Sequence, residues 1–355
     1  MPAARRDYRV GVVGLSGRGR QLASYWTGMA DARLVAVADS VPEQLDQTHT
    51  EISDVACYAD YQQMLAEADL DILTIALTEE QHAAVTRDAC ARGIRAIYCE
   101  KPMASSLADA DVMINACRDS GAVLQISHPR RWMDPIVRVR TAIQEGAIGQ
   151  PTFGFLYWPT GRVAQEGTHL FDAVNFMLDS RPVEVVGRVQ RGLDLTRVDD
   201  HPVYRTRSHD DPGAIGFITY ANGARVCVDA LNDVLMPPTY ILGGSRGRFD
   251  IEEAPWRIDY RARDADTHNH NQGRTAPARR DFPAPVAEAP GDAERRGFQE
   301  MIACITSGAT PTSSGADGRS ALETIVAFHL SSDAGVCPVS LPLPASANDF
   351  QLIAH

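Results

Sequence analysis

The alternation of short apolar runs with helix-length segments in the first 127 residues constrains the fold of this chain more than any other feature. The apolar runs lie at 8–14, 32–39, 70–77, 94–99 and 122–127. Segments with helical spacing separate them, such as 79–93, which ends at a glycine suited to cap a helix. Strands joined by helices of this length form βαβ units, with parallel strands and helices on both faces. The pattern therefore predicts an α/β fold with a doubly wound parallel sheet over residues 1–127.

The pattern changes after residue 127 and predicts a second domain over residues 128–355. Between 183 and 260, strand-like runs follow one another with few helical patterns, which indicates a mostly antiparallel sheet. Residues 262–295 are rich in Pro, Ala, Arg and Asp without a period, so we expect a long irregular loop there. The elements expected around them are a helix at 134–149, a strand at 150–159 and helices at 294–308 and 318–335.

The length, charge and cysteine content exclude several classes of protein. A chain of 355 residues suits two domains. The net charge is −12 and the basic residues form no long stripe, which argues against nucleic acid and anionic membranes as partners. No apolar run approaches the ~20 residues that span a bilayer, and the run near the start is too short for a signal peptide. The seven cysteines include no C-x-x-C pair, so we expect reduced thiols in a cytoplasmic protein.

A glycine-rich turn follows the first expected strand. The segment GLSGRGR fits the pattern G-x-G-x-x-G, with Gly14 and Gly19 in the outer positions, Ser16 in the middle one and Gly17 beside it. Glycines allow a tight turn, and the following helix directs its N-terminal N–H groups at a pyrophosphate. Ser16 departs from the pattern because its side chain crowds the pyrophosphate, which Gly17 can relieve. The turn predicts a dinucleotide site; the alternative is a tight turn that binds no ligand.

An acidic residue stands where the dinucleotide pattern requires one. Asp39 lies about 20 residues beyond Gly19, at the end of the second strand, where a carboxylate binds the ribose hydroxyls. The same carboxylate repels a 2′-phosphate, so we expect NAD. NADP is the alternative, since Ser40, Arg18 and Arg20 could soften that preference.

The apolar run 94–99 ends abruptly at Glu100, Lys101 and Pro102. In a doubly wound sheet, ligands bind beyond the carboxyl ends of the strands, so Lys101 is expected in the crevice that holds the nicotinamide. A lysine there can hydrogen-bond a substrate oxygen, or relay a proton if its surroundings shift its pKa. Glu100 would orient the ribose or the lysine, and Pro102 stiffens the turn. The alternative is a solvated turn with a surface ion pair.

The segment QEGTHLFDAVNFML carries a second group of polar residues. His169 and Asp172 are three residues apart, so on a helix they share one face and both can project into a pocket. A histidine with a nearby carboxylate suits proton transfer to or from an alcohol. Equally, the two residues could merely cap and satisfy a helix start.

Weaker candidates border these segments. Arg131 and Trp132 follow the last parallel strand and would either line the substrate site or form interdomain contacts. His82 lies early in a helix near the expected cofactor crevice, with a structural role as the alternative. The segment HNHNQ at 268–272 lies in the expected irregular loop without a partner ligand, so we predict no metal site.

Together these segments resemble the glucose–fructose oxidoreductase, inositol dehydrogenase and rhizopine-catabolism (Gfo/Idh/MocA) family. The resemblance covers most of the chain, is poor between about 190 and 295, and is carried by VGVVGLSGRGR, VAVAD, DILTIALTEEQH, YCEKPMA, HPRRWMDP, EGAIGQP, GTHLFDAVNFML and GRSALETIVAFHLSSDAGVCPVSLPL. It implies an N-terminal Rossmann domain and a C-terminal α/β domain whose large open sheet often mediates homo-oligomers such as dimers or tetramers. It also implies NAD(P)-linked oxidation or reduction of sugars and polyols, with Lys101 as the catalytic lysine and His169 as the proton carrier.

One residue and one three-residue segment depart from the family pattern. Gln165 stands where many members have an aspartate; it can hydrogen-bond a substrate hydroxyl but cannot take a proton, so more acid–base work falls to the histidine and the lysine. Leu77, Thr78 and Glu79 replace the common Thr-Pro-Asn in the segment that usually passes the cofactor.

These features predict an NAD(P)-dependent dehydrogenase that moves a hydride between nicotinamide and a secondary alcohol or ketone of a sugar, inositol or glycoside. The residues expected to hold the substrate are Gln165, Asp172, Arg131 and Trp132. The residues expected to contact the cofactor are Gly14, Ser16, Gly17, Arg18, Gly19, Asp39, Ser40, Leu77, Thr78, His82, Glu100 and Lys101. One alternative is a glycosidase or lyase that retains NAD and acts by transient oxidation and elimination. Another is a nucleotide-sensing regulator without catalysis.

Overall fold

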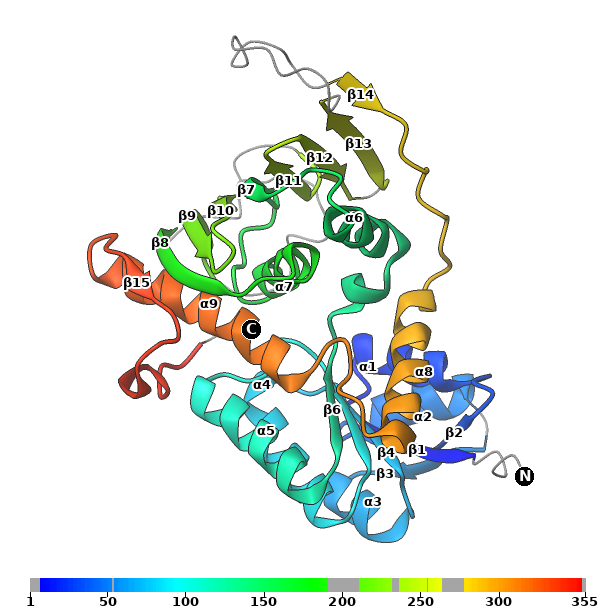
Figure 1. Ribbon diagram of the computed structural model, residues 1–355. Coiled ribbons are helices and arrows are strands. Elements are labelled where there is room, and N and C mark those ends of the chain that lie inside the picture. Colours follow the sequence, from blue (N-terminus) through cyan, green and yellow to red (C-terminus); the bar gives the residue numbers. More distant parts are fainter. Residues whose placement is uncertain are drawn as a thin grey trace, which may run out of the picture. The chain divides into compact units, whose positions relative to one another are not determined.

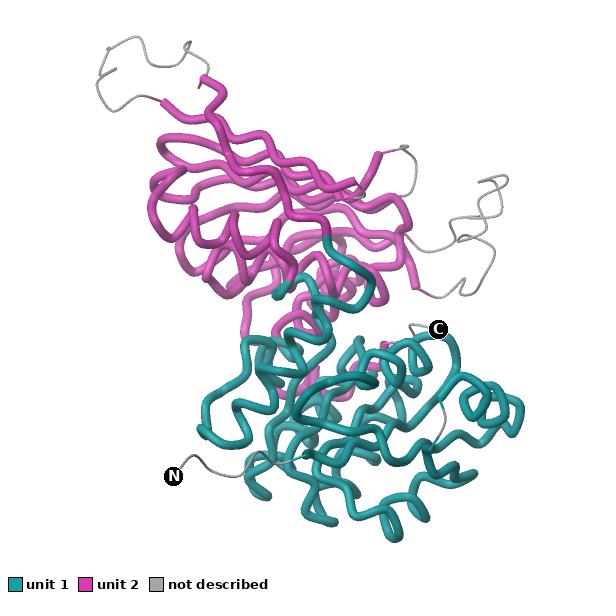
Figure 2. Tube along the Cα trace, turned by 90° about the vertical axis from the view of Figure 1, so that its right-hand side faces the viewer, with its two compact units in different colours: residues 1–132, 288–319 teal, residues 133–287, 320–355 magenta. Residues whose placement is uncertain are grey.

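The computed structural model describes residues 7–52, 54–190, 211–231, 236–253, 255–263 and 278–352. The chain forms two compact units, which Figure 2 shows in different colours. Unit 1 consists of residues 1–132 and 288–319, and unit 2 of residues 133–287 and 320–355. The chain thus leaves unit 1 close to the boundary expected at residue 127, but it returns there for about thirty residues before its C-terminal part.

Unit 1 is built on a six-stranded parallel sheet, which confirms the doubly wound architecture expected from the sequence (Figure 1). Its strands are β1 (Tyr8–Val13), β2 (Ala32–Ala38), β3 (Ala56–Tyr58), β4 (Ile72–Ile75), β5 (Ala96–Cys99) and β6 (Val123–Ile126). They are ordered β3-β2-β1-β4-β5-β6, and all neighbours pair in parallel. Successive strands are added towards one edge of the sheet from β1 to β3 and towards the other edge from β4 to β6, so the order switches between β1 and β4. Ligands of such sheets bind at this point, beyond the carboxyl ends of the strands.

The helices of the first segment alternate with these strands. They are α1 (Arg18–Trp26), α2 (Pro42–Glu51), α3 (Tyr61–Glu67), α4 (Glu79–Ala91), α5 (Leu107–Ser120) and the short 3-10 helix η1 (Pro129–Trp132). Local chemistry defines the ends of α5. The Ser106 side chain accepts a hydrogen bond from the Asp109 N–H at its start, and Gly121 ends it in the left-handed conformation.

The helix α8 (Asp292–Ser307) belongs to unit 1 although it lies far along the chain. Phe298 of α8 stacks on Trp26 with 3.9 Å between ring centroids and meets Tyr98 of β5 edge-on at 4.9 Å. All three rings are fully buried in one hydrophobic core. Because such rings bury large apolar areas, α8 is an integral part of the unit 1 core.

Unit 2 contains a nine-stranded, mostly antiparallel sheet, as expected. Its strands are β7 (Pro151–Tyr157), β8 (Pro182–Gln190), β9 (Gly213–Tyr220), β10 (Arg225–Asp229), β11 (Thr239–Gly244), β12 (Gly247–Glu252), β13 (Arg257–Ala262), β14 (Ala278–Arg280) and β15 (Val339–Ser340). The order is β14-β13-β12-β11-β7-β10-β9-β8-β15, and of the neighbouring pairs β7 and β10 are parallel. Of the irregular loop expected at 262–295, residues 264–277 lie outside the described residues, and β14 interrupts the remainder.

The remaining described helices are α6 (Asp134–Gln144), α7 (Gly167–Leu178), α9 (Gly315–Asp333) and the short 3-10 helix η4 (Ala345–Ala347), and α9 continues from unit 1 into unit 2. Phe328 of α9 packs on the sheet so closely that a Cβ at Gly187 of β8 would lie 2.4 Å from its ring. Phe171 of α7 lies between Phe328 and Trp158, 5.6 Å from each ring. Within the described part of the chain, none of the helices combines the length and apolar character needed to cross a membrane.

Candidate active site

The glycine-rich turn joins the carboxyl end of β1 to α1. Gly14 has a φ of 84°, and a Cβ there would lie 2.3 Å from the Ala76 carbonyl oxygen. A Cβ at Gly19 would lie 1.8 Å from the Gly14 carbonyl oxygen, so the close approach of strand, turn and helix requires glycine at both positions. Gly17 caps α1, and a Cβ there would meet nothing within 4 Å. Ser16 is exposed beside it. The turn therefore presents the open N-terminal end of a helix, which fits a pyrophosphate.

Asp39 directly follows β2 and faces this turn. Its Oδ2 accepts a hydrogen bond from the Leu15 N–H at 2.6 Å, and its Oδ1 accepts one from the Val41 N–H at 2.8 Å. Each carboxylate oxygen has a second lone pair, so Asp39 can hold the turn and still accept hydrogen bonds from ribose hydroxyls. Ser40 is exposed next to it.

The two arginines of the turn are already paired with other side chains. Arg18 donates from Nε to Glu100 Oε1 at 3.0 Å and from Nη2 to Glu294 Oε1 at 2.8 Å. Burial would lower the pKa of Arg18, but the two carboxylates outweigh it and raise that pKa. Arg20 donates to side-chain oxygens of two glutamines on α2. Because both arginines are paired with other side chains, the negative charge of Asp39 is the main charge beside the expected ribose. This favours NAD over NADP, whose 2′-phosphate a carboxylate would repel.

Glu100 is a buried anchor at the carboxyl end of β5, with 6% of its surface exposed. Besides Arg18, its Oε1 accepts a hydrogen bond from Ser127 Oγ at 2.7 Å, and Ser127 accepts one from the Tyr98 hydroxyl at 2.9 Å. Burial and the Glu100 charge raise the pKa of Tyr98, which keeps that hydroxyl a donor. The Lys101 N–H donates to Glu100 Oε2 at 3.3 Å. This arrangement fixes the backbone at Lys101 and differs from a solvated turn.

Lys101 is the only lysine in the chain, which otherwise uses arginine for its basic side chains. Arginine stays protonated under all ordinary conditions, whereas a lysine ammonium can lose its proton when its surroundings favour it. The one lysine is half-buried and directly follows β5, at the carboxyl end of the sheet, where it can donate a proton to a bound ligand or accept one. A single lysine in 355 residues is a sequence signal that could have strengthened the assignment of Lys101.

His82 links the two segments that flank the expected nicotinamide position. Its Nε2 lies 3.1 Å from the Leu77 carbonyl oxygen and its Nδ1 lies 3.1 Å from the Met103 carbonyl oxygen. Burial lowers the pKa of His82, against the influence of these carbonyls and of nearby Glu79 and Glu100. The imidazole therefore connects the segment after β4 to the segment after Lys101. It is a buried structural element of the site, and Thr78 beside it is exposed.

Arg131 and Trp132 are mostly buried and use their polar atoms inside unit 1. Arg131 donates to the Thr312 carbonyl oxygen and forms an ion pair with Asp317 at 3.1 Å. Trp132 Nε1 donates to Glu300 Oε2 at 2.5 Å. Both side chains thus attach the returning segment, with α8 and the start of α9, to the rest of the unit. A substrate-binding role for them remains a prediction.

The helix α7 of unit 2 carries the second group of predicted residues. His169 lies half-buried in its first turn, and Asp172 is fully buried one turn later. Burial and, to a lesser extent, the Asp172 charge raise the pKa of Tyr220. Gly167 begins the helix against Trp158, where a Cβ would lie 3.1 Å from the indole ring. The expected helical spacing of the histidine and the aspartate is confirmed.

Asp211 positions the backbone that leads into α7. It is 2% exposed, and its two oxygens accept hydrogen bonds from the N–H groups of Ala164 at 2.8 Å and Gln165 at 2.9 Å. The carboxylate therefore holds Gln165, the residue that departs from the family pattern, through its backbone.

Sequence reasoning did not identify three residues that support the predicted ones. They are Ser127 and Glu294 in unit 1 and Asp211 in unit 2. Ser127 directly follows β6, so its place at a strand end was a usable signal. Glu294 and Asp211 are far along the chain from their partners, and no local pattern marks them.

No metal site is apparent in the part of the chain that the structure describes, because no three His, Cys, Asp or Glu side chains there are grouped to hold an ion. The histidine-containing segment 268–272 lies outside the described residues.

Two domain models of one oxidoreductase family match this chain. The model described as the NAD-binding Rossmann fold of the oxidoreductase family matches residues 8–128. The model described as the C-terminal alpha/beta domain of the same family matches residues 154–341. Together the two matches span most of the chain and both of its sheets.

Similar proteins include two named dehydrogenases. The chain is 28% identical to a D-apiose dehydrogenase from Paraburkholderia graminis, over 87% of this chain and 84% of that protein. It is 26% identical to an inositol 2-dehydrogenase from Rhizobium meliloti, over 88% of this chain and 93% of that protein. A solved oxidoreductase from Agrobacterium radiobacter, in complex with NAD+, L-tartaric acid and magnesium, superposes with a TM-score of 0.77 and 20% identity, over 94% of this chain and 98% of that one. At that identity the superposition shows the fold alone.

Proposed function

Because the chain belongs to the Gfo/Idh/MocA family of NAD-binding oxidoreductases, we propose that it is a dehydrogenase acting on a secondary alcohol or ketone of a sugar, inositol or glycoside. The observation that carries the proposal is the position of the sole lysine, held by the Glu100 anchor at the carboxyl end of β5. The names of the similar apiose and inositol dehydrogenases support the class of substrate.

The residues around the glycine-rich turn fit NAD. When bound, NAD supplies the centre that takes or gives the hydride. The N-terminal N–H groups of α1, uncovered at Gly17, would hold the pyrophosphate, and Asp39 would accept hydrogen bonds from the ribose. Leu77 and Thr78 would form the wall beside it, and the buried His82 would support that wall from behind. The pairing of Arg18 with two carboxylates supports NAD over NADP.

Lys101 and His169 would share the acid–base work. His169 would take the proton of the substrate hydroxyl in oxidation and return it in reduction, since imidazole titrates near neutral pH. Lys101 would donate a hydrogen bond to a substrate oxygen and stabilise the negative charge that develops there. Gln165 would orient the neighbouring hydroxyls of the substrate, and Asp172, which is fully buried, would support the helix α7 that carries His169.

The first test measures the absorbance of reduced nicotinamide at about 340 nm with NAD or NADP and a panel of sugars, inositols and glycosides. A rising signal with NAD and one class of substrate supports the proposal. Product formation without a net absorbance change, with NAD retained by the purified protein, would favour the glycosidase or lyase alternative. Cofactor binding with no product from any compound would favour the regulator.

Variants at the sole lysine separate its two roles. Lys101→Ala is expected to lower kcat by at least about a hundredfold while NAD affinity changes little, because the side chain acts on the substrate oxygen. Lys101→Arg keeps the positive charge but cannot release a proton. Activity retained in Lys101→Arg would assign the lysine to charge stabilisation, whereas an equal loss in both variants would assign it to proton transfer. Near-normal kcat in Lys101→Ala would remove the residue from the mechanism.

We further propose that the chain forms homo-oligomers through the open face of the unit 2 sheet. On that face Phe217 and Phe153 are 58% and 49% exposed. Cross-strand partners Val186, Phe217, Cys227, Phe155 and Ile241 form one apolar row over five strands. Phe217→Asp should lower the sedimentation coefficient to that of a smaller species, and an unchanged value would refute this interface.

We also propose a cytoplasmic location, which the seven free thiols of the chain support.

A further inference from the structure

Two cysteines of unit 1 form a close pair outside the site described above. Cys90 in the last turn of α4 and Cys117 in the last turn of α5 place their sulfur atoms 3.7 Å apart. Both side chains are buried, with 9% and 3% exposed, and both are free thiols. Their spacing in the sequence resembles no redox motif, because the contact arises from the packing of α4 against α5.

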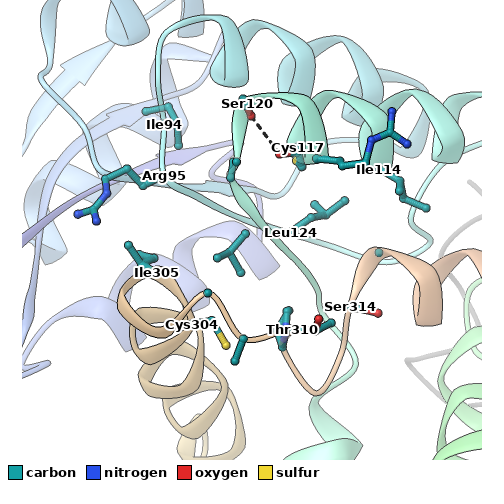
Figure 3. A pocket seen from close by; sticks show the side chains of 18 of the residues that line it. Ile94, Arg95, Ile114, Cys117, Ser120, Leu124, Cys304, Ile305, Thr310 and Ser314 are labelled. Atoms are coloured by element: carbon teal, nitrogen blue, oxygen red, sulfur yellow. Dashed lines mark hydrogen bonds between the residues drawn. The ribbon is translucent and has the colours of Figure 1, made fainter.

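A pocket of ≈ 740 Å³ gives access to one member of this pair. It lies in unit 1 around the amino ends of β5 and β6, at the opposite end of the strands from Lys101. Figure 3 shows Cys117 on its α5 side and Cys304 of α8 on the other side, with Leu124 between them. The pocket therefore leads from solvent to Cys117, whose sulfur lies 3.7 Å from that of Cys90, without passing the expected cofactor.

We propose that Cys90 and Cys117 are an oxidation site for small peroxides, reached through this pocket and closing to an intramolecular disulfide. A disulfide needs sulfur atoms about 2.0 Å apart, so rotation of the two side chains has to close about 1.7 Å. That movement is small compared with the reach of two cysteine side chains on neighbouring helices. The 3% exposure of Cys117 favours a small oxidant over a bulky one.

Cys90 is the activated thiol of the pair, because the hydrogen bond with Cys90 and burial raise the pKa of Cys117 and keep it protonated. The hydrogen bond from Cys117, against the opposing effect of burial and with help from Ser120, lowers the pKa of Cys90 to about 7. A thiolate is the reactive form of cysteine. By contrast, burial and Glu300 raise the pKa of Cys304, which lines the same pocket. Cys304 therefore serves as an internal control for access without activation.

The chemistry balances in two steps. The Cys90 thiolate attacks one peroxide oxygen; the O–O bond breaks, and the hydroxide that leaves takes a proton from solvent to become water. Cys90 is then a sulfenic acid. The Cys117 sulfur next loses its proton and attacks the Cys90 sulfur, so that an S–S bond forms, the S–O bond breaks, and the hydroxide that leaves takes up that proton as a second water. Two thiols and one hydrogen peroxide thus give one disulfide and two waters.

The test uses the full-length protein with Cys57→Ser and Cys337→Ser, which remove the two exposed thiols and prevent crosslinking between chains. The folded protein is treated with hydrogen peroxide, unfolded in an alkylating agent and mapped by peptide mass spectrometry. We expect a crosslinked peptide containing Cys90 and Cys117, a mass about 2 Da lower than the reduced form, and reversal by a thiol reductant. Cys304 should be recovered in its alkylated form.

Two outcomes would overturn the proposal. One is recovery of both Cys90 and Cys117 as free thiols at a peroxide dose that oxidises Cys57 and Cys337 in the unsubstituted protein. The other is oxidation of Cys304 at the same rate as the pair, which would show access without activation. In Cys117→Ser, Cys90 should stop at a sulfenic acid that a carbon nucleophile traps. If that variant does not fold, the peptide map of the unsubstituted protein still decides.

Discussion

Replacing Arg18 with alanine tests whether the carboxylates beside Lys101 depend on one guanidinium. Arg18 bonds both Glu100 and Glu294, whose side chains are 8% and 9% exposed. Removing one partner of a buried ion pair costs about 3–5 kcal/mol, because the remaining charge stays buried without compensation. Arg18 itself is 35% exposed, so water can enter the vacated space and the lower end applies. We expect Arg18→Ala to lower the free energy of unfolding by about 3 kcal/mol.

The assay is urea unfolding followed by tryptophan fluorescence, which senses Trp26 in the core of unit 1. Arg20→Ala is the matched control, because Arg20 sits two residues away and donates to uncharged glutamines. It should cost less than about 1 kcal/mol. A double-mutant cycle of Arg18→Ala with Glu294→Gln should show a coupling of at least about 1 kcal/mol. Equal losses for Arg18→Ala and Arg20→Ala, or a coupling near zero, would refute the reasoning.

Three further predictions concern other parts of the molecule. Burial holds the folded-state pKa of His82 below the unfolded value of about 6.5, so the stability that neutral His82 contributes is present above that pH and is lost as the pH falls. His82→Asn should therefore reduce the pH dependence of the unfolding free energy between about pH 7 and 5, by up to about 1.4 kcal/mol per pH unit. An unchanged slope of the unfolding free energy against pH would contradict this. Asp211→Asn should cost about 2 kcal/mol in urea unfolding, since an amide cannot accept both backbone N–H groups, and should raise the KM for substrate through displacement of Gln165; unchanged values in both measurements would remove its positioning role. Val336 is exposed with a φ of 65°, so Val336→Gly should raise stability by about 0.5–1 kcal/mol while Val112→Gly within α5 lowers it, as thermal unfolding would show.

Much of unit 1 could be predicted from local patterns. The alternation of strands and helices predicts a parallel sheet with helices on both faces, because crossover connections have one hand and parallel strands end at one edge. Gly14 and Gly19 could be assigned because a turn this tight excludes a Cβ. Lys101 could be placed at the carboxyl end of its sheet because it directly follows a strand. In each case the physical constraint acts within a few residues of the position itself.

Other features of the site were beyond local patterns. The sequence left two roles open for Glu100, orienting the ribose or orienting Lys101. Only its contacts with Arg18 and Ser127 show that it is an internal anchor. Arg131 and Trp132 were read as residues of a binding site or a junction, and their bonds to the returning segment are visible only in three dimensions.

The sequence by itself thus determined the parallel sheet of unit 1, the glycine turn with Asp39, and the placement of Lys101, because neighbouring residues enforce all three. Tertiary structure alone decided that α8 enters the core of unit 1, that Asp211 holds the start of α7, and that Cys90 meets Cys117. These contacts join residues far apart in the chain, and they depend on how apolar faces pack rather than on any local spacing.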